Sequence, residues 1–442
     1  MKLKKITSTI NNYFNVEEIE EFDKKNNDFQ VDIIINSKTK YQKHYGFGGA
    51  FTDSSGLVYS FMSNKNKKEF LKAYFSKDGL NYNLGRISIG SCDFSDRIYD
   101  YCSNSSMSDF SLEEAKKYVI PLIRDALKIN KDLHFMASSW SPPAFYKTNN
   151  AKIKGGKLKE DCYVKYAEYI VKFVDLIKKE NIYLKYLTIQ NEPLAKQTWE
   201  SCIFTSLEEA KLGILIKNKL EDKKINDVQL FVWDHNKDVI VERIKETLNY
   251  QNLYDLASGI AYHWYDGTDY SNVEAIHNLY KNKLIFLTEG CVELLNFKSI
   301  DYKENIGNFQ NGIRYIENYI LGANSFTNAF IDWNLLLFSD GGVNHVGNFC
   351  EAPIMYNQLN KKLIFNPSYY CIKHFAHFVH VNSFRIDVAN NSKLLVTSYL
   401  NTDGKKVVII LNKGKETAVI IQIDNILYKC YIKNESINTL IV

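Results

Sequence analysis

Two glutamates stand directly after short apolar runs, in positions that could support acid and base chemistry. Glu192 follows the run 186–190 within Gln-Asn-Glu-Pro, and Glu289 follows the run 283–288. Hydrolysis of a glycosidic bond needs two carboxyl groups that flank it, one protonated and one ionised. We therefore predict Glu192 as the general acid/base and Glu289 as the nucleophile of a retaining β-glycosidase. Mutual repulsion and partial burial should raise the pKa of Glu192.

The residues beside Glu192 suit the same use. Asn191 could hydrogen-bond a sugar 2-hydroxyl, a contact that strengthens in the transition state. Pro193 fixes the backbone after the acid and ends the strand. Asn-Glu-Pro alone is a weak motif, because Glu-Pro also ends ordinary strands. The stronger indication is the pair of glutamates, each at the end of its own apolar run.

Polar and aromatic side chains follow other apolar runs too. Flat rings pack against the C–H faces of sugars, and four of the five tryptophans lie at such run ends. We predict Asp93, Trp140 and Tyr265 as sugar contacts. His263 is either a further contact or a hydrogen-bonded histidine inside the fold. Trp333 stands at the end of the last run.

A few charged or reactive residues have two interpretations. Asp53 and Arg86 could be ion-pair partners inside the fold or sugar contacts. The pair Asp234-His235 could be functional or could hold a loop together. Cys291, beside Glu289, is expected to be a small buried side chain rather than a ligand.

The glutamates can meet only if their runs are strands of one sheet. Apolar, β-branched runs alternate with longer amphipathic stretches, and near-continuous apolar runs are typical of parallel strands buried on both faces. The eight runs are 45–49, 83–89, 133–138, 186–190, 228–233, 259–262, 283–288 and 328–332. Helical spacing is clearest over 163–178, 207–220 and 308–321. The pattern predicts an α/β fold, a (β/α)8 TIM barrel over residues 45–378, with strands four and seven on opposite sides of its mouth.

Both ends of the chain differ from this alternation. Residues 28–38 and 384–442 are strand-like with turns. Asn401-Thr-Asp-Gly404 separates two apolar runs and is a hairpin signal. We predict that residues 1–44 and 379–442 together form a small antiparallel, β-sandwich-like side domain.

The bulk composition excludes several classes of function. The chain has 442 residues and a net charge of +4, too balanced to indicate binding to nucleic acid or to an anionic membrane. No apolar stretch of about 18 residues could cross a membrane, and no leader-like segment is visible, so no integral membrane contact is expected. The eight cysteines occur without a C-x-x-C pair, which disfavours zinc and redox motifs. We expect reduced thiols in a cytoplasmic protein, and neither a metal nor a cofactor.

Taken together and in order, the motifs resemble glycoside hydrolase family 30, in particular its glucosylceramidase (acid β-glucosidase) branch. The resemblance covers most of the chain and rests on residues 46–53, 91–95, 139–143 with 147–149, 190–193, 263–265, 289–291, 332–334 and 347–349. It implies a (β/α)8 barrel with a β-domain from both termini, Glu192 as acid/base and Glu289 as nucleophile. It further implies that Tyr265 hydrogen-bonds the nucleophile. The glucose contacts that it implies are Asp93, Trp140, Asn191, Trp333 and Asn348.

The sequence also departs from that branch. Its animal lysosomal members have a signal peptide and N-terminal cysteines, whereas the first cysteine here is Cys92, so a lysosomal location is not implied. The loops after Pro193 and Tyr265, on the leaving-group side, match no motif. The sequence therefore does not indicate which leaving group the enzyme accepts.

We expect the chain to release a terminal β-glucosyl unit from a small β-glycoside, an oligosaccharide or a glycolipid. The alternatives within enzymes are a β-xyloside, a β-fucoside or a β-1,6-glucan as substrate. A sugar-binding barrel without catalysis is disfavoured by the presence of both glutamates. A cofactor-dependent barrel enzyme is disfavoured because no phosphate-binding glycine loop follows strands seven and eight. The oligomeric state stays open.

Overall fold

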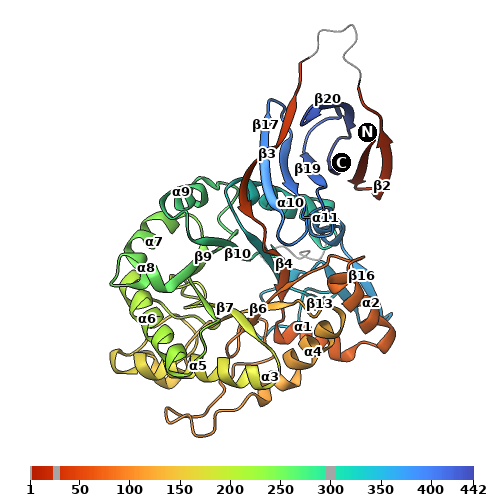
Figure 1. Ribbon diagram of the computed structural model, residues 1–442. Coiled ribbons are helices and arrows are strands. Elements are labelled where there is room, and N and C mark those ends of the chain that lie inside the picture. Colours follow the sequence, from red (N-terminus) through yellow and green to blue (C-terminus); the bar gives the residue numbers. More distant parts are fainter. Residues whose placement is uncertain (1, 23–29, 295–304) are drawn as a thin grey trace.

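A closed barrel of eight parallel strands forms most of the molecule, in a computed structural model that describes residues 2–22, 30–294 and 305–442. The strands close in the order β10-β12-β4-β5-β6-β7-β8-β9 (Figure 1). In chain order they are β4 (Gly46–Ala50), β5 (Leu84–Ser88), β6 (His134–Ser138), β7 (Leu184–Thr188), β8 (Gln229–Asn236), β9 (Ala257–His263), β10 (Leu284–Glu289) and β12 (Ala329–Asn334). Each predicted run corresponds to one of these strands, and the predicted (β/α)8 barrel is confirmed.

Helices surround the barrel and connect its strands (Figure 1). The three predicted helical stretches correspond to α5 (Tyr163–Lys179), α6 (Ser206–Asp222) and α10 (Phe309–Asn324). Helix α6 begins with a capping box, in which Thr205 and Glu208 satisfy each other's backbone N–H. The other helices are α1 (Asp53–Phe61), α2 (Asn64–Phe75), α3 (Glu113–Lys117), α4 (Val119–Ile129), α7 (Ile240–Leu248), α8 (Leu253–Leu256), α9 (Ser271–Leu279) and α11 (Pro367–Ala376), with short 3-10 turns η1 (Ala144–Tyr146) and η2 (Glu160–Cys162).

Side chains inside the barrel form two layers of different chemistry. The lower layer is an apolar cluster of Leu84, Met136, Tyr186, Phe231, Ala261, Phe286, Ala329 and Ile331. Because side chains alternate along a strand, the inward position two residues further on belongs to the next layer. On β5, β6, β7 and β10 that position is occupied by Arg86, Ser138, Thr188 and Thr288, all polar and buried. The polar layer therefore lies near the carboxyl ends of the strands, where barrel enzymes have their active sites.

Both ends of the chain build one nine-stranded sheet beside the barrel, near α10 and α11 (Figure 1). Its order is β2-β1-β22-β19-β18-β17-β3-β20-β21. The strands are β1 (Leu3–Thr9), β2 (Asn12–Ile19), β3 (Ile33–Lys43), β17 (Phe384–Asn390), β18 (Leu395–Leu400), β19 (Lys406–Asn412), β20 (Thr417–Ile423), β21 (Ile426–Ile432) and β22 (Ser436–Ile441). The predicted hairpin is β18 and β19. The predicted β side domain from both ends is confirmed.

Some details of this side domain differ from the sequence pattern. Strands β1 and β2 lack a local signal, and β2 is mostly exposed. The predicted strand 28–38 is found as β3 from Ile33 onward, and its residues 28 and 29 lie outside the described part. Strands β3 and β20 run parallel, within an otherwise antiparallel sheet. These features depend on pairing between distant segments, which a local pattern does not record.

The side domain is fixed to the barrel by a shared core. One face of the sheet contributes Tyr399, Val407, Ile409, Leu411 and Ile437 to the main cluster, which also contains residues of α10 and α11. The other face has an apolar cluster of its own, with members such as Ile35 and Ile410. The barrel and the sheet therefore form one packed body.

Two small sheets pair segments that follow barrel strands β10 and β12. Strand β11 (Val292–Glu293) pairs antiparallel with β14 (Cys350–Glu351), just after the end of β10. The other sheet contains β13 (Leu336–Phe338), β15 (Ile354–Asn357) and β16 (Lys362–Phe365). Pairing of β11 with β14 places Asn348 and Cys350 beside the segment that follows Glu289.

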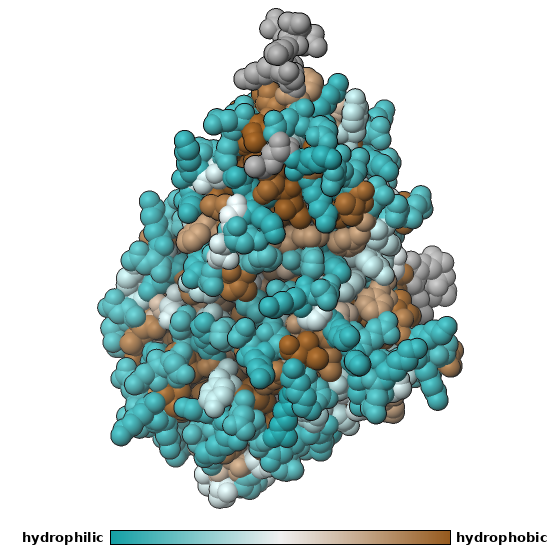
Figure 2. Space-filling model, turned by 45° about the vertical axis from the view of Figure 1, so that its right-hand side comes forward, coloured by the Kyte–Doolittle hydropathy of each residue, from teal (hydrophilic) through white to brown (hydrophobic). Residues whose placement is uncertain are grey.

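The outer surface is mainly polar. Figure 2 shows a face covered by hydrophilic side chains, with apolar ones in scattered small groups. Among the described residues, no helix is both long and apolar enough to cross a membrane.

Candidate active site

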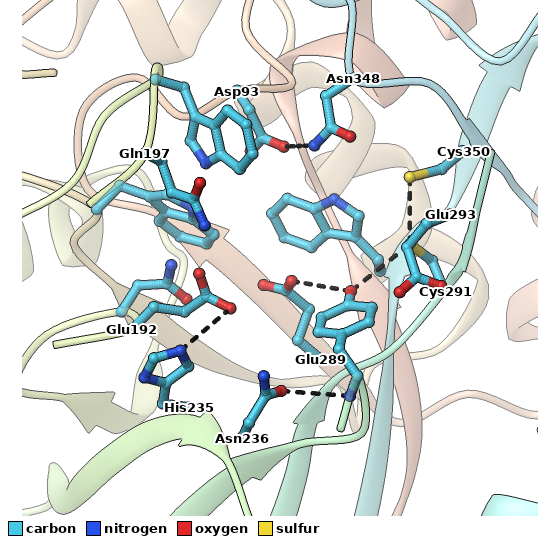
Figure 3. A pocket seen from close by; sticks show the side chains of 15 residues that line it. Asp93, Glu192, Gln197, His235, Asn236, Glu289, Cys291, Glu293, Asn348 and Cys350 are labelled. Carbon is cyan, nitrogen blue, oxygen red and sulfur yellow. Dashed lines mark hydrogen bonds and ion pairs between the residues drawn. The ribbon is translucent and has the colours of Figure 1, made fainter. Parts of the chain in front are cut away.

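The two predicted catalytic glutamates face each other across the barrel mouth (Figure 3). Glu289 is the last residue of β10, and Glu192 follows β7. A carboxylate oxygen of each and a ring nitrogen of His263 lie within 4.8 Å of one another, the one group in the described chain that could also hold a metal ion. The separation is close to the about 5–5.5 Å of retaining glycosidases and shorter than the about 6.5–9.5 Å of inverting ones. Glu192 has a φ of +47°, a strained backbone that persists only where the surroundings hold it.

Arg86 of β5 binds the predicted nucleophile from inside the barrel. Its Nη1 donates to Glu289 Oε2 at 2.5 Å, and its Nη2 donates to Asn191 Oδ1 and Asp234 Oδ2, both at 2.8 Å. The guanidinium is fully buried and lies 4.7 Å from the centre of the Trp140 ring. Of the two roles that the sequence allows for Arg86, the structure shows the ion pair.

Asp234 joins Arg86 to His263 in the buried polar layer. Strand β8 bulges between Trp233 and His235, and Trp233 and Asp234 have φ values of +78° and +64°. Such a bulge re-aims a side chain, and here Asp234 meets four donors inside the barrel. Burial would raise the pKa of Asp234, but the Arg86 charge and these hydrogen bonds hold it well below its usual value. The donors are Arg86, Thr188, His263 and Thr288.

His263 lies beneath Glu192 and does not line the cavity. Its Nδ1 is 3.2 Å from Glu192 Oε1, its Nε2 is 3.1 Å from Asp234 Oδ1, and the residue is fully buried. Of the two roles that the sequence allows for His263, the structure therefore favours the hydrogen-bonded histidine inside the fold over the substrate contact. The cause is the inward direction of the last residue of β9, which points the ring at the acid rather than at the solvent.

A cluster of predicted sugar contacts lies at another edge of the cavity. Asp93 and Asn348 stand across the view from His235 (Figure 3), and Asn348 Nδ2 donates to Asp93 Oδ2 at 2.9 Å. The rings of Trp140 and Trp333 are stacked, with centroids 5.3 Å apart. Burial, with a contribution from the charge of Glu289, raises the pKa of Asp93 to about 8. The structure thus brings these distant residues together.

Tyr265 and two cysteines form the wall beside Glu289. The Tyr265 hydroxyl donates to Glu289 Oε1 at 3.0 Å and lies 3.5 Å from Cys291 Sγ. Cys291 is buried, as expected, and its Sγ is 3.2 Å from Cys350 Sγ. Both thiols line the cavity, a position that their sequence does not indicate.

The pKa of Glu192 moves in the direction opposite to the expected one. Burial raises the pKa of Glu192, but the hydrogen bond with His263 and the charges of His235, His263 and Arg86 outweigh it, so this pKa lies below its usual value. Burial raises the pKa of Glu289 above its usual value, despite His263 and Arg86. The expected rise for Glu192 neglected the histidines packed around it. Groups this close share their protons and titrate together.

The cavity is small and includes residues that sequence reasoning missed. Its volume is about 210 Å³, below the about 300–1,000 Å³ typical of sites for drug-sized ligands, which suits a single sugar ring. The missed lining residues are Cys350, already described, and Gln197, Trp199, Asn236 and Glu293. The only sequence signal of the last four is a position shortly after the strands that carry the glutamates and Asp234.

The fold and the site define a glycosidase built on a (β/α)8 barrel, with two carboxyl groups at the retaining separation. The chain matches the glycosyl hydrolase family 30 TIM-barrel domain over residues 44–379 and the β-sandwich domain of the same family over residues 382–440. It belongs to glycoside hydrolase family 30.

Relatives within the family carry different activities in their names. The chain is 31% identical to the lysosomal acid glucosylceramidase of Mus musculus, over 87% of this chain and 78% of that protein. It is 24% identical to the endo-1,6-β-D-glucanase BGN16.3 of Trichoderma harzianum, over 84% of this chain and 78% of that protein. The crystal structure of SrfJ from Salmonella typhimurium has a TM-score of 0.94 at 31% identity, and the match covers 100% of this chain and 99% of that one.

Proposed function

We propose that this chain releases a terminal β-glucosyl unit from a β-glycoside by double displacement, with retention of configuration. The observation that carries the proposal is the pair Glu192 and Glu289, whose carboxylate oxygens lie within 4.8 Å at the mouth of the cavity. That separation leaves no room for a water between the sugar and the second carboxylate, so direct attack follows.

In the first step, Glu289 attacks the anomeric carbon while Glu192 protonates the departing oxygen. Arg86 and Tyr265 hold the two oxygens of Glu289 in place through the hydrogen bonds described above. In the second step, Glu192 takes a proton from water, the water oxygen bonds to the anomeric carbon, and Glu289 leaves. The pKa of Glu289 is above its usual value of 4.5, yet the Arg86 charge beside it favours the ionised form that attacks.

The glucosyl unit would sit between the tryptophan wall and the pair Asp93 and Asn348. The Asp93 carboxyl group can form hydrogen bonds with two neighbouring hydroxyls, and the stacked rings of Trp140 and Trp333 offer an apolar surface to the sugar. Because the cavity has room for little more than one sugar ring, we expect exo action on single terminal units. The 31% identical glucosylceramidase supports glucose as the sugar.

The leaving group would meet polar side chains. Gln197, Asn236 and Glu293 line the cavity, and Gln197 lies on the same side of the view as Glu192 in Figure 3. We therefore propose that the leaving group presents hydroxyls to the protein, as a second sugar or the head of a glycolipid does.

Covalent labelling tests the mechanism. A 2-fluoro β-glucoside with an activated leaving group should inactivate the enzyme, and peptide mass spectrometry should find the sugar on Glu289. Glu289→Gln serves as the matched control and should take up no label. Initial release of the α-anomer, followed by NMR, would refute the double displacement.

A panel of aryl glycosides tests the substrate. The β-glucoside, β-xyloside, β-fucoside and β-galactoside are compared by kcat/KM, with a β-1,6-glucan for endo cleavage. We expect the glucoside to be preferred. A preference for the xyloside, which lacks the hydroxymethyl group, by more than about tenfold, or about 1.4 kcal/mol of transition-state binding, would overturn glucose while leaving the mechanism intact.

The proposed compartment is a reducing one, the cytoplasm. All eight cysteines are free thiols in the structure, including the neighbouring pair in the cavity wall. This supports folding without disulfides.

A further inference from the structure

The buried ring of His263 connects the acid/base to a fully buried carboxylate. Its Nε2 is 3.1 Å from Asp234 Oδ1, and its Nδ1 is 3.2 Å from Glu192 Oε1. The ring has no access to the cavity, so any role in the reaction acts through Glu192. That role can be deduced from the number of protons that these contacts require.

Each carboxylate oxygen of Asp234 accepts two hydrogen bonds. Its Oδ2 accepts from Arg86 Nη2 and Thr188 Oγ1, and its Oδ1 accepts from Thr288 Oγ1 at 2.6 Å. A carboxylate with these donors and a buried guanidinium beside it is ionised and can only accept. The contact between Asp234 and His263 therefore has its proton on Nε2 of the histidine. This fixes the orientation of the ring and leaves only the protonation of Nδ1 to be determined.

The contact between His263 Nδ1 and Glu192 Oε1 must then contain one proton. With the proton on Nδ1, an imidazolium faces a carboxylate. With the proton on Oε1, a carboxylic acid donates to a neutral imidazole. Without a proton, two lone pairs would face each other at 3.2 Å in a buried place, which is unfavourable.

We propose that Glu192 and His263 hold the catalytic proton in common, with His263 as a positioning residue that stores it between turnovers. The inference rests on the proposed function, because it assigns the acid/base role to Glu192. Its basis is the fixed Nε2–H and the single proton that the Nδ1 contact requires.

The surroundings favour storage on the histidine in the free enzyme. Against the cost of burial, the charge of Glu289 and the hydrogen bonds to Asp234 and Glu192 raise the pKa of His263 to about 9. The pKa of Glu192 is lowered by the same contact, so at neutral pH the proton lies mainly on Nδ1. The titratable or charged groups that face this pair are Asp234, Glu289, Arg86, Tyr265 and His235, whose Nε2 is 4.0 Å from Glu192 Oε1.

The proton balance of the reaction follows from this arrangement. In the first step, the proton moves from Nδ1 to Glu192 and on to the departing oxygen, as the C–O bond breaks and Glu289 bonds to the sugar. The bare Nδ1 then faces the Glu192 carboxylate. This unfavourable contact raises the proton affinity of the pair, so Glu192 readily takes a proton from the attacking water and shares it with His263 again.

A pH profile of His263→Gln tests the proposal. Two β-glucosides are used, one with an alkyl leaving group that needs protonation and one with a dinitrophenyl leaving group that does not. In the wild type, the pair keeps its proton to high pH. In the variant, Glu192 must hold the proton alone, so the basic limb of kcat/KM for the alkyl glucoside should move down by at least about one pH unit, or about tenfold in rate above the limb. The dinitrophenyl glucoside should show no such move.

His235→Gln is the matched control, because it removes the other imidazole near Glu192 without breaking the link to Asp234. Because the charge of His235 lowers the pKa of Glu192, the basic limb of this variant should not move down as that of His263→Gln does. If His263→Gln lowers kcat/KM equally on both glucosides and the basic limb does not move, His263 has only a structural role. Failure of the wild type to cleave either β-glucoside would instead overturn the proposed function.

Imidazole ¹⁵N NMR of the unmodified protein gives a second reading that does not depend on a variant. We expect Nδ1 of His263 to be protonated in the free enzyme at pH 7. In the long-lived 2-fluoroglucosyl enzyme the charge of Glu289 is gone, so the proton should move from Nδ1 towards Glu192 within the same contact. The same protonation state in both forms would overturn the proposal.

Discussion

Replacing Arg86 by methionine should weaken both the fold and the nucleophile. The change removes a buried cation that pairs with Asp234 and Glu289, whose side chains are 0% and 10% exposed. Removing one partner of a buried ion pair costs about 3–5 kcal/mol, and Asp234 keeps three other donors, so we expect the lower half of that range. A charge-assisted hydrogen bond contributes about 1.5–3 kcal/mol, which corresponds to about 1–2 pKa units. The pKa of Glu289 should rise by that amount.

The assay combines urea unfolding with a pH profile on the dinitrophenyl β-glucoside. Because Glu289 must be ionised to attack, the acidic limb of kcat/KM should move up by about 1–2 pH units. Arg86→Lys keeps the charge but cannot span three acceptors, so it should recover most of the limb and part of the stability. An unmoved acidic limb in Arg86→Met, with a stability loss below about 1 kcal/mol, would refute the reasoning.

Other substitutions and the cysteines give further tests. Asp93→Ala should lower kcat/KM on the β-glucoside by about 10- to 150-fold, from a loss of about 1.5–3 kcal/mol, and much less on a glycoside that lacks the contacted hydroxyls. Because burial raises the pKa of Asp93 from 3.8 to about 8, the folded state loses stability as the pH rises between these values, so in urea unfolding Asp93→Asn should stabilise the protein at pH 8 and not at pH 4. The lowered pKa of Asp234 has the opposite sign, with stability present above pH 3.8 and lost as the pH falls below it, and Asp234→Asn should flatten the acid part of the same unfolding curve. Mass spectrometry under non-reducing, denaturing conditions should find eight free thiols, and a bridge between Cys291 and Cys350 would contradict the reducing compartment.

The catalytic pair could be predicted because it depends on two local signals. Each glutamate ends an apolar run, and eight alternating runs imply a barrel in which the fourth and seventh strands face each other. The side-domain hairpin was predictable for the same reason, since its turn and its two runs are contiguous. Residue type and position along the chain were therefore sufficient to predict the regular parts of the structure.

Arg86, Asp234 and His263 needed the three-dimensional structure. Arg86 is a single charge within an apolar run, and only the strand register shows that it points inward to Glu289. Asp234 turns inward at a bulge that no local pattern marks. The direction of His263 depends on both, because Asp234 fixes its ring. Strands β1 and β2 could not be predicted from the local sequence for a related reason. Their stability depends on pairing with the distant strand β22 rather than on their own residues.

The pairing of β1 with β22 has a consequence for how such a protein can be assembled and inherited. Thr7 donates to Asn438, a residue 431 positions further along the chain. During synthesis, β1 waits for β22, and β3 waits for β17 and β20, until the whole barrel has been made. Unpaired strand edges are prone to aggregation in that interval. In evolution, the side domain cannot be exchanged by joining one gene to the end of another, because its two parts flank the barrel. An exchange requires the barrel to be inserted into a loop of the sheet, so the two units must be inherited together.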